Sequence, residues 1–565
     1  MYKKILTLAL SAALLLSGCT WVGQNLDEVL AALETTQPAA TTPTTSGGET
    51  TDVPADDASP GGLARLQAQY TRPDLDEYLA LAEEAYTLGE TSSSLSAVVR
   101  KVNQLYDAYD EFYTMLYLAD ISYSMDLSDT SWQAEYDFCM SASTQVDESI
   151  ELLYASLAQS PILDELEGQL FGDGFFDGYD QPGSAWPEEF TRLLEEEAQL
   201  LTEYYDQSDV MAGLDPYAPD YFDQAAQTLG PVMLDLISVR QEMADLWGYE
   251  SYEAFAWDFY YYRDYTTEQV DSYLEDIRQY LVPVYTQLWG QDDIYDIFDG
   301  SYDASQCLAY VSSAAENMGG IIEDAYALMA GDGLYDLSAS PNKYPGSFEV
   351  YLISFDVPFV FLNPGGDITD LTAFAHEFGH FANDYAAEGA YLSADVAEIM
   401  SQAMEYLSLD YATAPDEDTL ALVRQAKLAD SLSTYVEQAA YYSFEREMYA
   451  MDNPTLEDLN AAYAEVAQAF GFDTVGWAPG EWATVPHFFT QPFYILSYVV
   501  SNDAAMQIYQ MEQEEAGSGL ALYTDMLYLW ESTSPLTFLE EQGLGSPFAS
   551  GRVEALAGYF QAALC

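Results

Sequence analysis

The chain has 565 residues, with 15 Lys and Arg against 95 Asp and Glu, which gives a formal net charge of −80 at pH 7. So few basic residues argue against nucleic acid or an anionic lipid surface as a partner, because both are bound by clustered Lys and Arg. Hydrophobic residues make up 49% and aromatic residues 15%. The chain is therefore too apolar to be an acidic disordered polymer, and it can bury a large core.

The N-terminus carries the signals of an exported protein. Lys3 and Lys4 precede an apolar run over residues 5–16, which is typical of a secretory signal and short for a transmembrane helix. The Leu16-Ser17-Gly18-Cys19 sequence resembles the bacterial lipobox. This resemblance implies that residues 1–18 are a signal peptide and that the thiol of Cys19 is lipidated. We expect the mature protein to be anchored by this lipid alone to the extracytoplasmic face of the cell membrane.

A linker separates this anchor from the rest of the chain. From about residue 35 to residue 62 the sequence is rich in Thr, Pro, Ser and Gly and nearly lacks large apolar residues. We therefore expect residues 19–62 to form a disordered tether. No second linker of this composition follows, so residues 63–565 are predicted to be one large unit. Four cysteines are too few for a disulfide framework.

The folded part is predicted to be mainly α-helical. Apolar residues recur every three to four positions, the period of a half-buried helix, in residues 74–88, 95–118, 187–205, 221–247, 267–289 and 305–329. Residues 348–354 and 358–363 differ, because they are short, rich in β-branched and aromatic residues, and bounded by Pro and Gly. They are predicted to be two strands joined by a turn around Asp356.

The three histidines of the chain mark a candidate metal site. His376, Glu377 and His380 form an HExxH motif. On a helix, residues four apart share a face, so both imidazoles can bind one metal ion while Glu377 reaches a water molecule beside it. His487, the third histidine, follows about a hundred residues later in a Pro-His-Phe-Phe sequence.

A catalytic zinc ion takes three protein ligands, so one more is needed. After a break at Gly389, residues 393–407 are predicted to form a second helix that carries Glu398 and Glu405, seven residues apart on one face. Periodicity does not choose between these two carboxylates. The one that is not a ligand is expected to accept a hydrogen bond from a ligand histidine and so orient its ring.

Three segments together resemble the thimet oligopeptidase and oligoendopeptidase F family of zinc peptidases. They are the AHEFGH sequence, the AEIMSQAMEY sequence with Glu405 twenty-five residues after His380, and the segment of His487. The similarity covers about residues 343–505. It implies that His376, His380 and Glu405 bind one Zn²⁺ per chain, with Glu398 in a supporting position and Glu377 as the catalytic base.

The same resemblance assigns the transition-state donors. It places His487 and nearby tyrosines beside the reacting carbonyl. Two tyrosines of the family pattern are replaced here, by Phe489 and Leu496. Tyr494 and Tyr498 remain, and the sequence does not decide which of them has this role.

The implied fold is a large two-lobed helical zincin-type peptidase with a small β-sheet beside the active-site helix. The implied function is a membrane-anchored extracellular zinc-dependent oligoendopeptidase that hydrolyses short unstructured peptides. Two alternatives stay open: a peptide-binding lipoprotein without turnover, and a related HExxH carboxypeptidase. The scarcity of Lys and Arg speaks against the carboxypeptidase, because such enzymes hold the substrate carboxylate with a cation.

Overall fold

The computed structural model describes residues 60–179, 186–212, 214, 218–291, 294–298, 300–472, 477–530 and 534–565. The predicted signal peptide, the lipidated Cys19 and nearly all of the predicted tether lie outside the described residues. Among the residues that are described, no helix is both long enough and apolar enough to cross a membrane.

Helices account for most of the described chain. The N-terminal helices are α2 (Gly62–Gln67), α3 (Leu75–Thr91), α4 (Leu95–Ser124), α5 (Thr130–Leu157), α6 (Leu163–Leu166) and α7 (Glu188–Ala212). The central helices are α8 (Tyr221–Trp247), α9 (Tyr252–Ala256), α10 (Thr267–Asp276), α11 (Val282–Trp289), α12 (Ala304–Met318) and α13 (Gly320–Asp332). The C-terminal helices are α14 (Thr369–Ala387), α15 (Ala394–Tyr411), α16 (Glu417–Ser433), α17 (Ala439–Tyr449), α18 (Leu456–Ala469), α19 (Pro486–Thr490), α20 (Ile495–Glu514), α21 (Ser518–Met526), α22 (Pro535–Glu541) and α23 (Arg552–Leu564).

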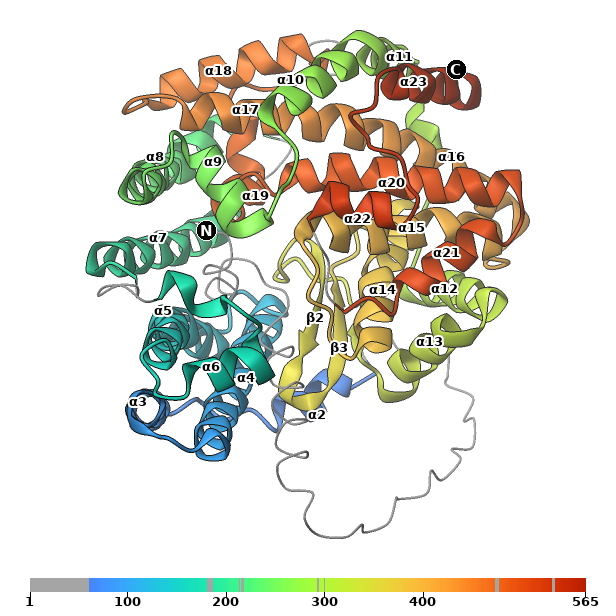
Figure 1. The fold of residues 1–565 in the computed structure, drawn as a ribbon. Coiled ribbons are helices and arrows are strands. Elements are labelled where there is room, and N and C mark those ends of the chain that lie inside the picture. The colour runs from blue at the N-terminus through green and yellow to red at the C-terminus, as the bar shows by residue number, and fades with distance from the viewer. Residues whose placement is uncertain are drawn as a thin grey trace.

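The helices form two lobes with the sheet between them (Figure 1). Helices α3 to α6 pack together at the lower left of the view, and the C-terminal helices fill the right and the top. Strands β2 and β3 lie against α14, and β2 also contacts α4 of the other lobe. The predicted fold class is confirmed: the protein is mainly α, two-lobed, with a small sheet beside the helix of the HExxH motif.

The sheet has three strands in the order β1-β3-β2. Strands β2 (Ser347–Leu352) and β3 (Val357–Leu362) are antiparallel, and both lie within one residue or two of their predicted bounds. The turn between them passes through Asp356, which has a left-handed φ of 56°. Strand β1 (Tyr335–Asp336) pairs parallel to β3 and was not predicted, because two residues are too few to show a period.

One helical prediction differs from the structure. The stretch 305–329 is not one helix, because Gly319 interrupts it between α12 and α13 with a φ of 71° that glycine adopts without strain. The stretch 267–289 is helical throughout, with one π-helical turn at Ile277–Leu281 between α10 and α11.

Candidate active site

Helix α14 carries the HExxH motif, and α15 lies directly against it. Glycine at position 379 allows this close approach, because a Cβ there would lie 2.7 Å from the carbonyl oxygen of Met400 and from the Cα of Ser401. Any larger residue would push the two helices apart. The backbone contact at Gly379 therefore sets which carboxylate of α15 reaches the histidines.

That carboxylate is Glu398. Its Oε2 atom lies 3.3 Å from Nε2 of His376 and 3.8 Å from Nε2 of His380. One ligand atom from each of these three residues lies within 4.8 Å of the other two. Two imidazole nitrogens and a carboxylate oxygen are a donor set that suits zinc and leaves a position open, so the residues present fit the metal. The histidine side chains are 18% and 12% exposed, toward a cavity that substrate can enter.

Glu405 lies on the other side of the His376 ring. Its Oε1 accepts a hydrogen bond from Nδ1 of His376 over 2.9 Å, and its Oε2 accepts one from Nζ of Lys427 over 2.6 Å. The structure therefore corrects the expected ligand set: Glu398, and not Glu405, groups with the two Nε2 atoms, and Glu405 has the supporting position. The two glutamates share one helix face but are two turns apart, and only the crossing point of α14 and α15 separates their roles.

The three grouped residues differ in their titration. Burial lowers the pKa of the His376 imidazole, but its hydrogen bonds to Glu398 and Glu405 outweigh this effect and raise the pKa well above its usual range, so a metal ion has to displace a proton from this ring. Burial raises the pKa of Glu398, but the hydrogen bond and the charge of His376 outweigh this effect and lower it to about 2. Burial lowers the pKa of His380 to about 4. The structure thus holds an ionised carboxylate beside a neutral imidazole, the forms in which these groups bind a metal.

Glu377 points from α14 into the same cavity. Burial raises the pKa of its carboxyl to about 7, partly offset by the charge of His376. A carboxylate with a pKa near neutrality is suited to take up and release a proton during catalysis. The position and the environment of Glu377 are those of a general base.

His487 and the two candidate tyrosines form a second wall of the cavity. Nε2 of His487, on α19, lies 3.2 Å from the hydroxyl oxygen of Tyr498. The hydroxyl of Tyr494 instead donates to Oε1 of Glu398 over 2.6 Å. The structure thus distinguishes the two tyrosines: Tyr494 contacts a metal-site carboxylate, and Tyr498 contacts His487.

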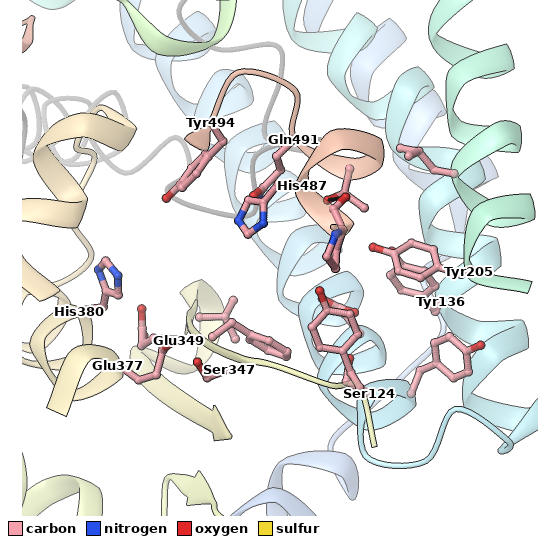
Figure 2. Close-up of a pocket in the computed structure, with 18 of the residues that line it drawn as sticks. Ser124, Tyr136, Tyr205, Ser347, Glu349, Glu377, His380, His487, Gln491 and Tyr494 are labelled. Carbon is pink, nitrogen blue, oxygen red and sulfur yellow. Dashed lines mark hydrogen bonds between the residues drawn. The ribbon is translucent and has the colours of Figure 1, made fainter. Parts of the chain in front are cut away.

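All of these groups except Glu405 line one cavity of about 1430 Å³, measured to its solvent-open mouth. Figure 2 shows His380 and Glu377 on one side, with Tyr136 and Tyr205 on the opposite side. The walls therefore come from both lobes.

Two residues at the site were missed by sequence reasoning. Glu349 of β2 is buried on the cavity wall, where burial and the charges of Asp384 and Glu377 raise the pKa of its carboxyl. Lys427 of α16 is buried beside Glu405. The composition favoured a carboxylate partner for Lys427. Because acidic residues greatly outnumber basic ones in this chain, a buried Lys or Arg is expected to lie against a carboxylate.

Known proteins were compared with this chain. The model of the peptidase M3 N-terminal domain matches residues 66–181, and that of peptidase family M3 matches residues 316–557. Oligopeptidase PepF of Bacillus subtilis (strain 168) is 23% identical over 274 residues, which span 44% of this chain and 40% of that relative. The matched region thus covers less than half the length of this relative.

Solved structures are similar over much more of the chain. PZ peptidase A with an inhibitor has a TM-score of 0.76 at 19% identity, covering 88% of this chain and 98% of that one. An oligoendopeptidase F structure from Bacillus anthracis (strain Ames) has a TM-score of 0.73 at 20% identity, covering 88% and 97%. These similarities establish the fold.

Fold and site together define a helical metallopeptidase with an HExxH helix and a glutamate from the helix that follows. The two family models cover most of the described chain between them, and the chain belongs to peptidase family M3.

Proposed function

We propose that this protein is a zinc-dependent endopeptidase that hydrolyses short unstructured peptides. The proposal depends on one observation: His376, His380 and Glu398 lie together in a cavity that Glu377, His487 and Tyr498 also line. A Zn²⁺ ion held by the first three residues supplies the Lewis acidity that activates water and polarises the scissile carbonyl.

The residues of the chain supply the proton transfers and the hydrogen bonds. Glu377 takes a proton from the attacking water and passes it to the leaving amine. His487 and Tyr498 lie together on the cavity wall, where they donate hydrogen bonds to the oxyanion that forms from the carbonyl. Tyr494 holds Oε1 of Glu398 and so fixes the orientation of that carboxylate.

The position of the reacting groups limits the size of the substrate. The reacting groups lie inside a cavity whose walls belong to both lobes, so an extended peptide can enter and a folded protein is too wide. In the part of the chain that the structure describes, no Lys or Arg lines this cavity. An exopeptidase that holds the terminal carboxylate of its substrate needs such a cation, so internal cleavage is favoured over carboxypeptidase activity.

The test of this function uses the variant Glu377→Gln on the zinc-loaded protein. It is expected to keep its zinc and to lose at least about a thousandfold in kcat on a nine-residue peptide, because general-base catalysis contributes up to about 10⁴. Glu323→Gln on exposed α13 is the matched control and is expected to retain full activity. Mass spectrometry of the wild-type products is expected to show internal cuts that a chelator prevents. Stoichiometric peptide binding without cleavage would instead identify a binding protein.

The proposal places this peptidase outside the cell, tethered by a lipid. It rests on the apolar run of residues 5–16, on the lipobox-like sequence ending at Cys19 and on the Thr- and Pro-rich segment that follows. The replacement Cys19→Ala is expected to move the protein from the membrane fraction to the soluble fraction. An unchanged distribution between the two fractions would contradict the anchor.

A further inference from the structure

The end of the cavity farthest from the HExxH helix differs chemically from the catalytic end. Helices α4, α5 and α7 and the loop before β2 line it with Tyr123, Tyr136, Tyr205, Tyr344, Ser124 and Asp120. We call these six residues the aromatic end. Figure 2 shows Ser124, Tyr136 and Tyr205 across the cavity from Glu377 and His380.

Three tyrosines of the aromatic end are in contact through their rings. The rings of Tyr123 and Tyr136 stack with their centroids 5.8 Å apart, and Tyr205 meets Tyr136 edge to face at 6.0 Å. Contact between the rings limits their movement and keeps their electron-rich faces in place. Such a group of aromatic rings attracts an organic cation.

Asp120 is the acid of the aromatic end. It lies on α4, half-buried, with Ser124 as its hydrogen-bonding neighbour and the hydroxyls of Tyr136, Tyr205 and Tyr344 nearby. Burial raises the pKa of its carboxyl to about 7, and among the described residues no Lys or Arg lines the cavity with it. A carboxylate that is shielded from water and lacks a positive partner within the described structure binds an entering cation strongly.

The remaining cavity wall also carries acidic side chains. Its other acidic residues are Glu349, Glu377 and Glu398, and no Lys or Arg is among the described residues that line it. Of these glutamates, Glu377 and Glu398 belong to the catalytic end, and Glu349 lies beside them on β2. Asp120 is thus the carboxylate that a substrate side chain meets at the aromatic end.

We propose that the aromatic end is a subsite for a cationic group of the peptide substrate, held by Asp120 and the faces of Tyr136 and Tyr205. The substrates are then peptides that carry Lys or Arg at a set distance from the cleaved bond. This inference rests on the proposed peptidase function and names the substrate class that the cavity selects. A free N-terminal ammonium has the same chemistry, so the test must separate the two sources.

The first experiment compares matched peptides on the wild-type protein. The peptides are internally quenched, acetylated and amidated, and differ only by Lys or norleucine at one position on either side of the cleaved bond. At one of these positions we expect kcat/KM to be about tenfold higher for Lys, the range of a charge-assisted hydrogen bond. A norleucine peptide with a free N-terminus that gains the same factor would assign the subsite to the ammonium terminus.

Two variants then test whether Asp120 causes the preference for Lys. Asp120→Asn is expected to reduce the Lys-to-norleucine ratio to about twofold or less. Glu111→Gln removes one charge from an exposed position on the same helix and is expected to keep the ratio of the wild type. Equal rates for all peptides in the wild type, or the same loss in both variants, would overturn the subsite.

A binding measurement tests the subsite independently of the proposed peptidase activity. Fluorescence anisotropy of the labelled Lys and norleucine peptides with Glu377→Gln measures affinity without turnover. A preference for Lys that Asp120→Asn removes supports the subsite even if the wild type cleaves no peptide. Cleavage without any difference between the two peptides in rate or affinity supports the peptidase and rejects the subsite.

Discussion

Nδ1 of His376 donates a hydrogen bond to Oε1 of Glu405 over 2.9 Å, on the opposite side of the ring from the nitrogen that faces Glu398. When the ring is neutral, a proton kept on Nδ1 by this hydrogen bond leaves the lone pair of Nε2 for the metal site. Lys427 lies 2.6 Å from the other oxygen of Glu405. Burial raises the pKa of Glu405, but the charge of Lys427 outweighs this effect and lowers it. The chain from Lys427 to His376 thus holds the ligand histidine in one tautomer.

The two glutamates of α15 are expected to respond differently to replacement. Glu398→Gln removes a ligand and is expected to abolish tight zinc binding. Glu405→Gln removes only the group that orients His376, which costs about 10–100-fold in metal affinity. Chelator competition measures both constants, and a larger loss for Glu405→Gln than for Glu398→Gln would reverse the assignment.

Replacements of Tyr494 and Tyr498, the two tyrosines near His487, are also expected to have different effects. Tyr498→Phe removes a donor to the oxyanion, so kcat is expected to fall by about 10²–10³ while zinc affinity stays unchanged. Tyr494→Phe removes the hydrogen bond to Glu398, so zinc affinity is expected to fall by about tenfold or more. Tyr528→Phe, at a position that is 54% exposed, serves as the control. A kcat loss confined to Tyr494→Phe would contradict these roles.

A buried ion pair connects α15, the helix of Glu398, to the segment that contains Tyr494 and Tyr498. Nη2 of Arg263 lies 3.2 Å from Oδ1 of Asp395, with both side chains fully buried, and also donates to the carbonyl of Phe493 over 3.0 Å. Phe493 has a left-handed φ of 66°, and its N–H donates to Glu445 over 2.8 Å. These contacts hold a strained residue directly before Tyr494.

Replacing this arginine is expected to destabilise the protein strongly. Arg263→Met leaves Asp395 buried without its cation, at a cost of about 3–5 kcal/mol. Arg278→Met breaks a surface pair with Glu275 in which both side chains are well exposed, and is expected to cost less than about 1 kcal/mol. Thermal melts of both variants test the contrast, and equal shifts of the midpoint would contradict it.

A buried acid in α5 is expected to make stability depend on pH. Burial raises the pKa of Asp147 to about 8, although Tyr109 and Tyr113 both donate to its Oδ1. The folded protein binds this proton more tightly than the unfolded chain, in which the pKa is about 4. The stabilising contribution is therefore complete below about pH 4 and is lost as the pH rises to about 8.

Asp147→Asn removes this titration. The variant is expected to gain stability relative to the wild type as the pH rises from about 5 to about 9. Asp164→Asn, at an exposed position on α6, is expected to follow the wild type at every pH. Melting midpoints across this range test the prediction, and a constant difference between Asp147→Asn and the wild type would reject it.

Local patterns were sufficient for much of the fold. The period of 3.6 residues predicted α8 with its observed bounds, and alternation with flanking Pro and Gly predicted β2 and β3. Gly319 and β1 were missed because a single glycine and a two-residue strand leave no periodic trace. The HExxH pair was predictable because its geometry depends only on the turn of one helix.

The remainder of the site depends on contacts between distant segments. Sequence alone determined that His376 and His380 share a helix face on which both can reach one metal ion, with Glu377 beside them, since residues four apart on a helix lie on the same side. It did not decide between Glu398 and Glu405, which share a face as well. The crossing of α14 and α15 at Gly379 determines which of the two glutamates lies beside the Nε2 atoms of the histidines. The packing of the two lobes places Asp120 in the same cavity as His376. Composition showed a strongly acidic chain, and only the tertiary structure placed one of those acids, Asp120, in a cavity that no described Lys or Arg lines.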